Sequence, residues 1–102
     1  MAEVIVSRNA HADLDRLVAY LIDEEPAAAL VTCDLLLGAL ELLRTYPTIG
    51  RPVDRVLREL VISRGSTGYL GLYEYDARTD RVVVLALRHQ REAGYSERGA
   101  TE

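Results

Sequence analysis

Apolar positions recur at helical spacing through the first half of the chain. From Ala10 to Glu25 they fall at i, i+3 and i+4, and acidic residues such as Asp13 lie on the opposite side, which predicts an amphipathic helix packed by one stripe. Pro26 disfavours a helical conformation in Glu25 and suits the first turn of a new helix. We therefore predict a second helix from Pro26 to Tyr46 and a tight antiparallel hairpin of the two helices.

The second half of the chain changes to the shorter period of β-strands. Three stretches are rich in aliphatic residues and tyrosine, and short polar turns separate them, which is typical of an antiparallel meander. The last stretch has six aliphatic residues in a row and is typical of a strand that is buried on both faces. The three predicted strands are Arg58–Ser63, Tyr69–Tyr75 and Arg81–Arg88.

A further short strand, Glu3–Ser7, opens the chain. The predicted order of elements is β-α-α-β-β-β, with the helices before the last three strands. This order implies the α+β class, in which the N-terminal strand and the helical hairpin pack on one face of an antiparallel sheet of three to four strands. No predicted element is left to cover the other face. The 102 residues (1–102) suffice for one domain with a single core.

The second predicted helix carries more apolar surface than one packing face needs. Its polar residues form a narrow wedge, and the apolar residues cover about 260° of a helical wheel. The first helix and the sheet can cover roughly half of that arc. The remainder, around Val31, Leu35 and Leu42, is exposed unless another chain covers it; the alternative is deeper burial within the monomer.

Charge and composition narrow the classes of function. The formal net charge of −4 argues against broad, non-specific binding of nucleic acid. The apolar runs are far too short to span a membrane and nothing marks secretion, so we expect a cytoplasmic protein. The single cysteine, Cys33, precludes an internal disulfide. Two histidines that are far apart in sequence, with one cysteine, offer no ligand spacing for a metal, and we expect no cofactor.

A polar cluster follows the last predicted strand. The polar residues Arg88, His89 and Arg91 follow the buried aliphatic run. A buried strand is rigid and can hold such side chains in fixed positions. Two interpretations remain open at this point. The residues form a functional cluster at the sheet edge, or the core strand simply runs into a solvated tail.

Four motifs follow one another in an order that matches a known protein family. They are GRPV from Gly50, RELVI from Arg58, GSTGYLGLY from Gly65 and VLALRHQREAGY from Val84. Together with the preceding pair of helices, they resemble the RelE/ParE superfamily of toxins from bacterial type II toxin-antitoxin systems. The resemblance implies a small cytoplasmic toxin that a cognate antitoxin holds inactive by wrapping its C-terminal segment around it. Such wrapping would cover both the surplus apolar stripe and the open sheet face.

The superfamily contains two biochemical classes. RelE-like members resemble ribonucleases that cut messenger RNA on the ribosome. If this chain has that activity, we expect His89 to be the acid, Arg88 and Arg91 to hold the phosphate, and Glu59 to be the base, with Tyr95 beside them.

The sequence departs from the RelE-like pattern where cations are expected. RelE-like members commonly have an arginine after the Gly-Tyr pair and lysines on the preceding strand. This chain has Leu70 after the pair, and Val61 and Ser63 on the strand before it. The charge that develops on the phosphate in the transition state would therefore lack partners there.

ParE-like members resemble inhibitors that bind DNA gyrase. An aliphatic sheet face of Val61, Leu70 and Leu72 suits such binding, and Arg64 and the terminal cluster become contact residues. We favour this class. Ribosome-dependent cleavage of messenger RNA and a non-toxic paired interaction module are the alternatives. Either a toxin-antitoxin hetero-oligomer or a homodimer is expected, because the second helix has surplus apolar residues.

Overall fold

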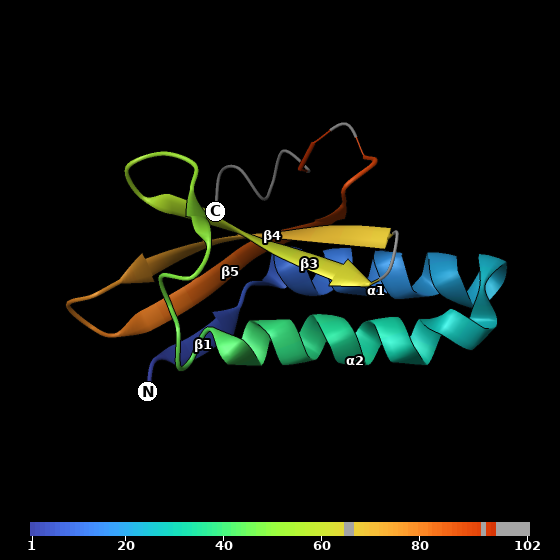
Figure 1. The fold of residues 1–102 in the computed structure, drawn as a ribbon, viewed down its shortest axis with the longest axis horizontal. Helices are drawn as coiled ribbons and strands as arrows, with labels where there is room; N and C mark the ends of the chain where they lie inside the picture. The colour runs from blue at the N-terminus through green and yellow to red at the C-terminus, as the bar shows by residue number, and fades with distance from the viewer. Residues whose placement is uncertain (65–66, 93, 96–102) are drawn as a thin grey trace.

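A strand, two helices and four further strands follow one another along the chain (Figure 1). The structure is a computed structural model that describes residues 1–64, 67–92 and 94–95, apart from the side chains of Arg64 and Thr67. Within these residues the elements are Glu3–Val6 (β1), Arg8–Glu24 (α1), Pro26–Leu42 (α2), Arg51–Pro52 (β2), Leu57–Arg64 (β3), Thr67–Asp76 (β4) and Arg81–His89 (β5).

All the strands join one sheet in the order β1-β5-β4-β3-β2. The neighbours from β5 to β2 run antiparallel, whereas β1 lies parallel to β5, with Glu3 opposite Arg81. The predicted α+β class and helical hairpin are confirmed. The predicted antiparallel sheet of three to four strands is corrected to a mixed, five-stranded sheet in the described residues. The difference arises because β1 pairs along the free side of β5 and the loop after Gly50 adds β2, an edge position that tolerates Pro52.

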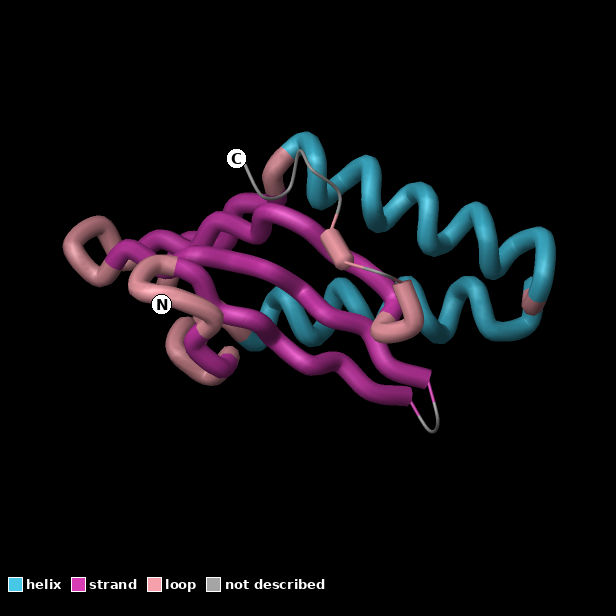
Figure 2. Tube along the Cα trace, turned by 90° about the horizontal axis from the view of Figure 1, so that it is seen from above, coloured by secondary structure: helices cyan, strands magenta, loops and turns pink. Residues whose placement is uncertain are grey.

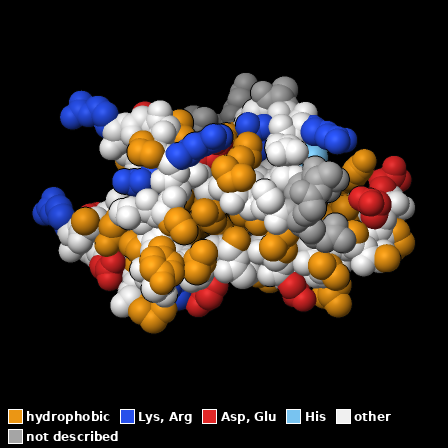
Figure 3. Space-filling model, in the orientation of Figure 1, with side chains coloured by type: hydrophobic (Ala, Val, Ile, Leu, Met, Phe, Trp, Pro, Cys, Tyr) orange, Lys and Arg blue, Asp and Glu red, His pale blue; other side chains and the backbone are white. Residues whose placement is uncertain are grey.

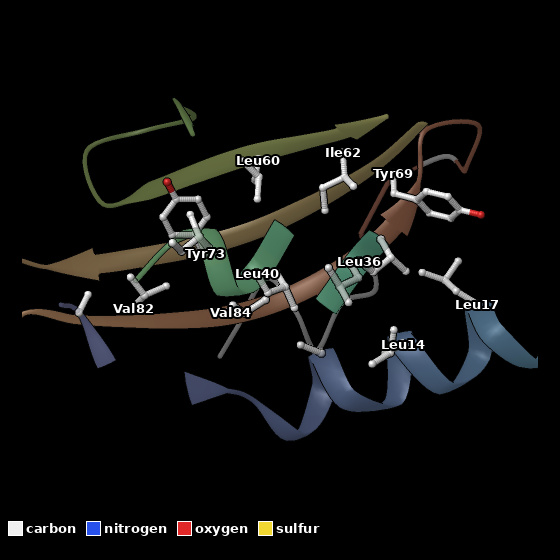
Figure 4. Packing of buried hydrophobic residues seen from close by; sticks show 14 residues of the cluster. Leu14, Leu17, Leu36, Leu40, Leu60, Ile62, Tyr69, Tyr73, Val82 and Val84 are labelled. Atoms are coloured by element: carbon white, nitrogen blue, oxygen red, sulfur yellow. The ribbon is translucent and has the colours of Figure 1, made fainter. Parts of the chain in front are cut away.

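Both helices cover the same face of this sheet (Figure 2). α1 packs on β5 and α2 packs on β3. Buried leucines of the helices point toward the apolar side chains of the strands and form one core (Figure 4). The labelled members of this core are Leu14, Leu17, Leu36, Leu40, Leu60, Ile62, Tyr69, Tyr73, Val82 and Val84.

Local signals set the ends of the helices. The Ser7 hydroxyl oxygen accepts a hydrogen bond of 3.0 Å from a backbone N–H in the first turn of α1, and so caps it. Glu25 interrupts the helical path, and Pro26 begins α2 as predicted. α2 ends at Leu42 rather than Tyr46, because turns follow it. Among the described residues, no helix combines the length and the apolar content needed to cross a bilayer.

A β-bulge in the β4–β5 ladder lies beside the start of α1. The register shifts between Leu72 and Tyr73, which leaves Leu85 without an opposite residue on β4. The carbonyl of Leu85 accepts hydrogen bonds from the Ser7 hydroxyl at 3.2 Å and from the Asn9 side-chain amide at 3.0 Å. The irregularity in the ladder thus fixes the position of α1 on the sheet.

Asp13 makes a second connection between α1 and β5. Its side chain is buried, with only 5% of the residue exposed, and its carboxylate accepts a hydrogen bond of 2.9 Å from the backbone N–H of Leu87. Arg16 lies 3.6 Å from the same carboxylate. The prediction that Asp13 lies on the solvent side of the helix is therefore wrong. Its partner is 74 positions away in sequence, so the helical period carries no sign of the contact.

Tyr73 holds the loop before β2 against the sheet. The residue is fully buried, its hydroxyl accepts a hydrogen bond from the Gly50 N–H at 2.9 Å, and it donates one to the Pro47 carbonyl at 2.8 Å. A side-chain carbon at Gly50 would lie 2.7 Å from the Tyr73 ring, so this close approach requires glycine.

Tyr73→Phe is expected to lower the free energy of unfolding by about 1–3 kcal/mol, because it leaves the buried groups on both sides without a partner. Urea denaturation followed by circular dichroism measures the change. Tyr20→Phe is the control, since Tyr20 is exposed on α1 and should change stability by less than about 0.5 kcal/mol. Equal losses in the two variants would contradict the expectation.

Candidate functional site

The predicted polar cluster is divided between the two faces of the sheet. Arg88 and His89 are consecutive in β5, and successive side chains of a strand point to opposite faces. His89 lies opposite Tyr69 on β4, and the two rings meet edge to face with centroids 5.1 Å apart. Tyr69 belongs to the core beneath the helices. His89 therefore lies on the helix side of the sheet and Arg88 on the open face.

Glu59 is the centre of an open-face cluster, which we define as Arg51, Glu59, Arg88 and Tyr95. One oxygen of its carboxylate accepts hydrogen bonds from two nitrogens of Arg51, Nε at 2.9 Å and Nη2. The other oxygen accepts one of 2.7 Å from the Tyr95 hydroxyl. The Arg88 guanidinium carbon lies 5.0 Å from the centroid of the Tyr95 ring, a cation–π geometry. The fold thus brings Glu59, Arg88 and Tyr95 together, while their catalytic role stays a prediction.

Burial and hydrogen bonding set the protonation of this cluster. Burial disfavours the charged form of Glu59, but the hydrogen bonds from Tyr95 and Arg51 outweigh it and lower the pKa of Glu59. Burial and the hydrogen bond to Glu59 both raise the pKa of the Tyr95 hydroxyl. At neutral pH the pair is therefore a carboxylate that accepts and a phenol that donates. A carboxylate with a lowered pKa is a weak base, which disfavours the role of general base for Glu59.

Glu59→Gln is expected to lower the free energy of unfolding by roughly 1–3 kcal/mol at pH 7. Because folding lowers the pKa of Glu59, the carboxylate stabilises the fold above its unfolded-state pKa of about 4.3. This contribution is lost as the pH falls through the lower folded-state pKa. The difference between the wild-type protein and the variant should therefore shrink in urea denaturations at progressively lower pH.

The control for this pH dependence is Glu3→Gln. The Glu3 carboxylate pairs with Arg81 at 3.0 Å, but both side chains are largely exposed. An exposed ion pair stabilises by about 1 kcal/mol or less, so this variant should stay close to the wild-type protein at each pH. A loss in Glu59→Gln that is the same at every pH would contradict the expectation.

The aliphatic residues predicted on the open face differ in exposure. Val61 is 52% exposed, whereas Leu70 and Leu72 are only 7% and 4% exposed. The prediction of an uncovered face is therefore wrong at Leu70 and Leu72. Arg64 ends β3, but its side chain lies outside the described residues.

Tyr95 lies over the strands that carry these residues. It contacts Arg88, which lies opposite Leu70, and it is hydrogen-bonded to Glu59, which lies opposite Leu72. The side chain therefore extends from β5 across β4 to β3. Tyr95 therefore lies on the face of the sheet away from the helices.

His89 lines a hollow of about 680 Å³ between α1 and the end of β5, which we name the α1–β5 hollow. Glu92 closes one side of it, since its carboxylate accepts hydrogen bonds from the His89 N–H at 2.9 Å and from Arg16 at 3.1 Å. Nδ1 of His89 accepts a hydrogen bond from the Arg91 N–H at 3.0 Å, so a neutral His89 carries its proton on Nε2. The lining residues are Arg16, Leu17, Tyr20, Leu21, Glu25, Tyr69, His89, Arg91 and Glu92.

The predicted contact residues on α2 remain at the surface. Val31 and Leu42 are exposed, and Leu35 is half-buried against the core. The surplus of apolar surface on this helix is confirmed, since no part of the chain that the structure describes buries Val31 or Leu42. Leu30 and Leu37 extend the same surface.

Residues of these sites that were not predicted from the sequence include Arg51, Arg16 and Tyr20. Arg51 lies opposite Glu59 only because the short β2 pairs with β3, and no local pattern signals that pairing. Arg16 and Tyr20 both line the α1–β5 hollow. They are four positions apart on α1, so their shared helical face was a signal that could have found them.

Known proteins resemble this chain over most of its length. The protein named "Toxin RelE3" of Caulobacter vibrioides is 34% identical over 92 residues, which are 90% of this chain and 98% of that relative. "Toxin RelE1" of the same bacterium is 37% identical over 70 residues, which are 69% of this chain and 75% of the relative.

Solved structures share the fold. A chromosomal ParDE toxin-antitoxin system from P. aeruginosa aligns with a TM-score of 0.71 at 18% identity, over 87% of this chain and 96% of the other. The RelBE2 toxin-antitoxin complex from Mycobacterium tuberculosis aligns with a TM-score of 0.56 at 23% identity, over 89% and 93%. The family model described as "ParE toxin of type II toxin-antitoxin system, parDE" matches residues 4–94. The chain therefore belongs to the ParE toxin family, within the RelE/ParE superfamily of type II toxin-antitoxin systems.

Proposed function

We propose that this protein poisons cells by binding DNA gyrase and that a cognate antitoxin neutralises it. The observation that carries the proposal is the open-face cluster, in which Arg51 and Tyr95 hold the Glu59 carboxylate. Val61, on the same strand and face as Glu59, is the exposed one of the aliphatic residues predicted there. A surface of this kind is suited to contact with another protein, because arginine and tyrosine side chains are enriched at protein interfaces.

The same contacts disfavour cleavage of RNA. Attack by a 2′-hydroxyl needs a base, an acid and cations around the phosphorane. His89 lies in the α1–β5 hollow, on the opposite face from Glu59 and Arg88. Arg88 is also engaged, since it donates a hydrogen bond of 2.8 Å to the Glu92 carbonyl and contacts the Tyr95 ring. A joint role for these groups on one phosphate would require them to rearrange.

An antitoxin partner has separate support. Two solved structures that share this fold are described as a toxin-antitoxin system and a toxin-antitoxin complex. The exposed apolar residues of α2, such as Val31 and Leu42, are the kind of surface that a partner covers.

A ribosome-dependent messenger-RNA endoribonuclease is the second candidate. The two relatives from Caulobacter vibrioides carry the RelE name. The α1–β5 hollow also places Arg16, His89 and Arg91 around one space, where an acid and two cations could meet a phosphate.

A gyrase supercoiling assay beside a ribosome-dependent messenger-RNA cleavage assay separates the two functions. We expect inhibition of supercoiling and an intact message. His89→Ala should weaken the inhibition by less than about tenfold, because His89 lies on the opposite face of the sheet from the open-face cluster. If His89 is instead the acid of a nuclease, the same change should slow cleavage by about 10²–10⁴. Codon-phased cuts in the message would overturn the proposal, and activity in neither assay would favour a non-toxic paired module.

A further inference from the structure

The loop between β2 and β3 presents apolar side chains at the tip of a hairpin. Val53 and Val56 in this loop are 53% and 61% exposed. The loop rises from the sheet on the side away from α2 (Figure 1). Scattered exposed apolar residues are ordinary, but two in one short loop beside a polar, aromatic cluster mark a candidate binding surface.

The pairing of the hairpin places Val53 beside the open-face cluster. Arg51 lies opposite Glu59, and the Val53 N–H donates a hydrogen bond of 2.9 Å to the Leu57 carbonyl, which continues the same pairing. Alternation along a strand then puts Val53 on the face of Arg51 and Glu59. Val61, two residues after Glu59 on β3, points to this face as well. We name Arg51, Val53, Arg55, Val56 and Val61 the β2–β3 surface.

The arginines of this surface lie further out than the acids around it. The side chain of Arg51 is 64% exposed, whereas that of its partner Glu59 is only 9% exposed. Arg55 is exposed, and within the described residues it has no hydrogen bond or ion pair. Glu74, opposite Leu57 on β4, is half-buried. A partner therefore meets positive charge here, although the net charge of the chain is −4.

The view of the whole surface agrees with this distribution of charge. In Figure 3, arginine side chains lie mainly in the upper half of the view, over the strands and the loop after β2. Most acidic side chains lie in the lower half or at the right, over the helices. The face with the open-face cluster is thus the more cationic one.

Hydrogen bonds hold the tip of the hairpin in one conformation. One carboxylate oxygen of Asp54 accepts hydrogen bonds from the N–H groups of Val56 and Leu57, both at 2.8 Å. At the base, the Tyr73 hydroxyl fixes the preceding segment through Gly50. A surface that is already ordered loses little conformational entropy when it binds, so more of its contact energy appears as affinity.

We propose that the β2–β3 surface extends the gyrase contact beyond the open-face cluster, and that it fits an acidic, apolar patch of gyrase. This inference rests on the proposed function, because gyrase supplies the partner surface. The three valines cover apolar side chains of gyrase, and Arg51 and Arg55 pair with its carboxylates. Arginine is enriched in interface hot spots, and charge complementarity speeds the encounter of two proteins.

RNA matches the β2–β3 surface less well than an acidic protein does. Phosphates would pair with Arg51 and Arg55, but Val53 lies between them in sequence and Val56 follows. Valine offers neither a ring on which a base stacks nor a hydrogen bond to a base edge. A protein partner uses both the charged and the apolar residues.

The first test measures the concentration of the full-length protein that halves supercoiling by gyrase. Val53→Ser with Val56→Ser should raise this concentration by about tenfold or more, because apolar contact area is lost. The matched control is Ile22→Ser with Leu30→Ser, since these residues are 58% and 73% exposed on the helices and should leave inhibition unchanged. Urea denaturation verifies that both double variants are folded.

Charge variants test the cationic part of the surface. Arg55→Glu should raise the half-inhibitory concentration by about tenfold at low salt, and this difference should shrink as salt screens the charges. Arg8→Glu reverses an exposed charge at the start of α1 and should have no such effect. Asp54→Ala leaves the valines in place but frees the tip, so it should weaken inhibition by roughly threefold.

The outcomes separate this inference from the proposed function. If the wild-type protein inhibits gyrase and the valine variant does so at the same concentration, the inference is overturned and the proposed function stands. If the wild-type protein neither inhibits gyrase nor binds it in surface plasmon resonance, both are overturned. Loss of ribosome-dependent cleavage in the valine variant would assign the surface to the ribosome and would also overturn the inference.

Discussion

Asp13→Ala is expected to lower the free energy of unfolding by roughly 3 kcal/mol. The Asp13 carboxylate accepts hydrogen bonds from the Leu87 N–H at 2.9 Å and from the Asn9 side-chain amide at 3.4 Å. Alanine leaves the backbone N–H of a buried strand without an acceptor and removes a link between α1 and the sheet. Urea denaturation at pH 7 measures the loss.

Asp15→Ala is the matched control, because Asp15 lies two positions further along α1 and is exposed. It should change stability by less than about 0.5 kcal/mol. Asp13→Asn keeps an oxygen that can accept from Leu87, so its loss should fall between those of the two alanine variants. If both alanine variants lost the same stability, Asp13 would be the surface residue that the helical pattern predicts.

Leu36→Ala is expected to cost about 2–5 kcal/mol, as is typical of a buried leucine whose removal leaves a cavity. Leu36 is fully buried on the side of α2 that faces the sheet (Figure 4). The same denaturation experiment measures the change. A cost below about 1 kcal/mol would mean that α2 is rotated about its axis or that the site collapses around the smaller residue.

Leu37→Ala is the control for Leu36→Ala. The two leucines are adjacent in sequence, but the Leu37 side chain is exposed. Its replacement should change stability by less than about 1 kcal/mol, because little apolar area is removed from the core. Comparing the stabilities of the two variants therefore shows which side of an almost continuously apolar helix faces the sheet.

Most of the elements could be predicted because their signals are local. The spacing of leucines and the break at Pro26 locate α1 and α2, and alternation with polar turns locates β3 to β5. The place of β1 could not be predicted in this way. Glu3 and Arg81 are 78 positions apart, and only the assembled sheet shows that β1 fills the free side of β5.

The candidate site was predicted in part. The sequence showed that polar and charged residues lie at the end of β5. The strand, however, extends to His89, one residue beyond its predicted end. With that extension, alternation separates Arg88 from His89. The place of Tyr95 beside Glu59 could not be predicted, because the two residues are 36 positions apart in sequence.

The parallel pairing of β1 with β5 also constrains the order in which the newly made chain can fold. The first strand has no partner until the residues opposite it, Arg81 to Val84, have left the ribosome, and closing so long a loop is slow. The contacts between the two helices are local and can form earlier during synthesis. The hairpin of α1 and α2 can therefore be in place on a nascent chain whose sheet is still incomplete.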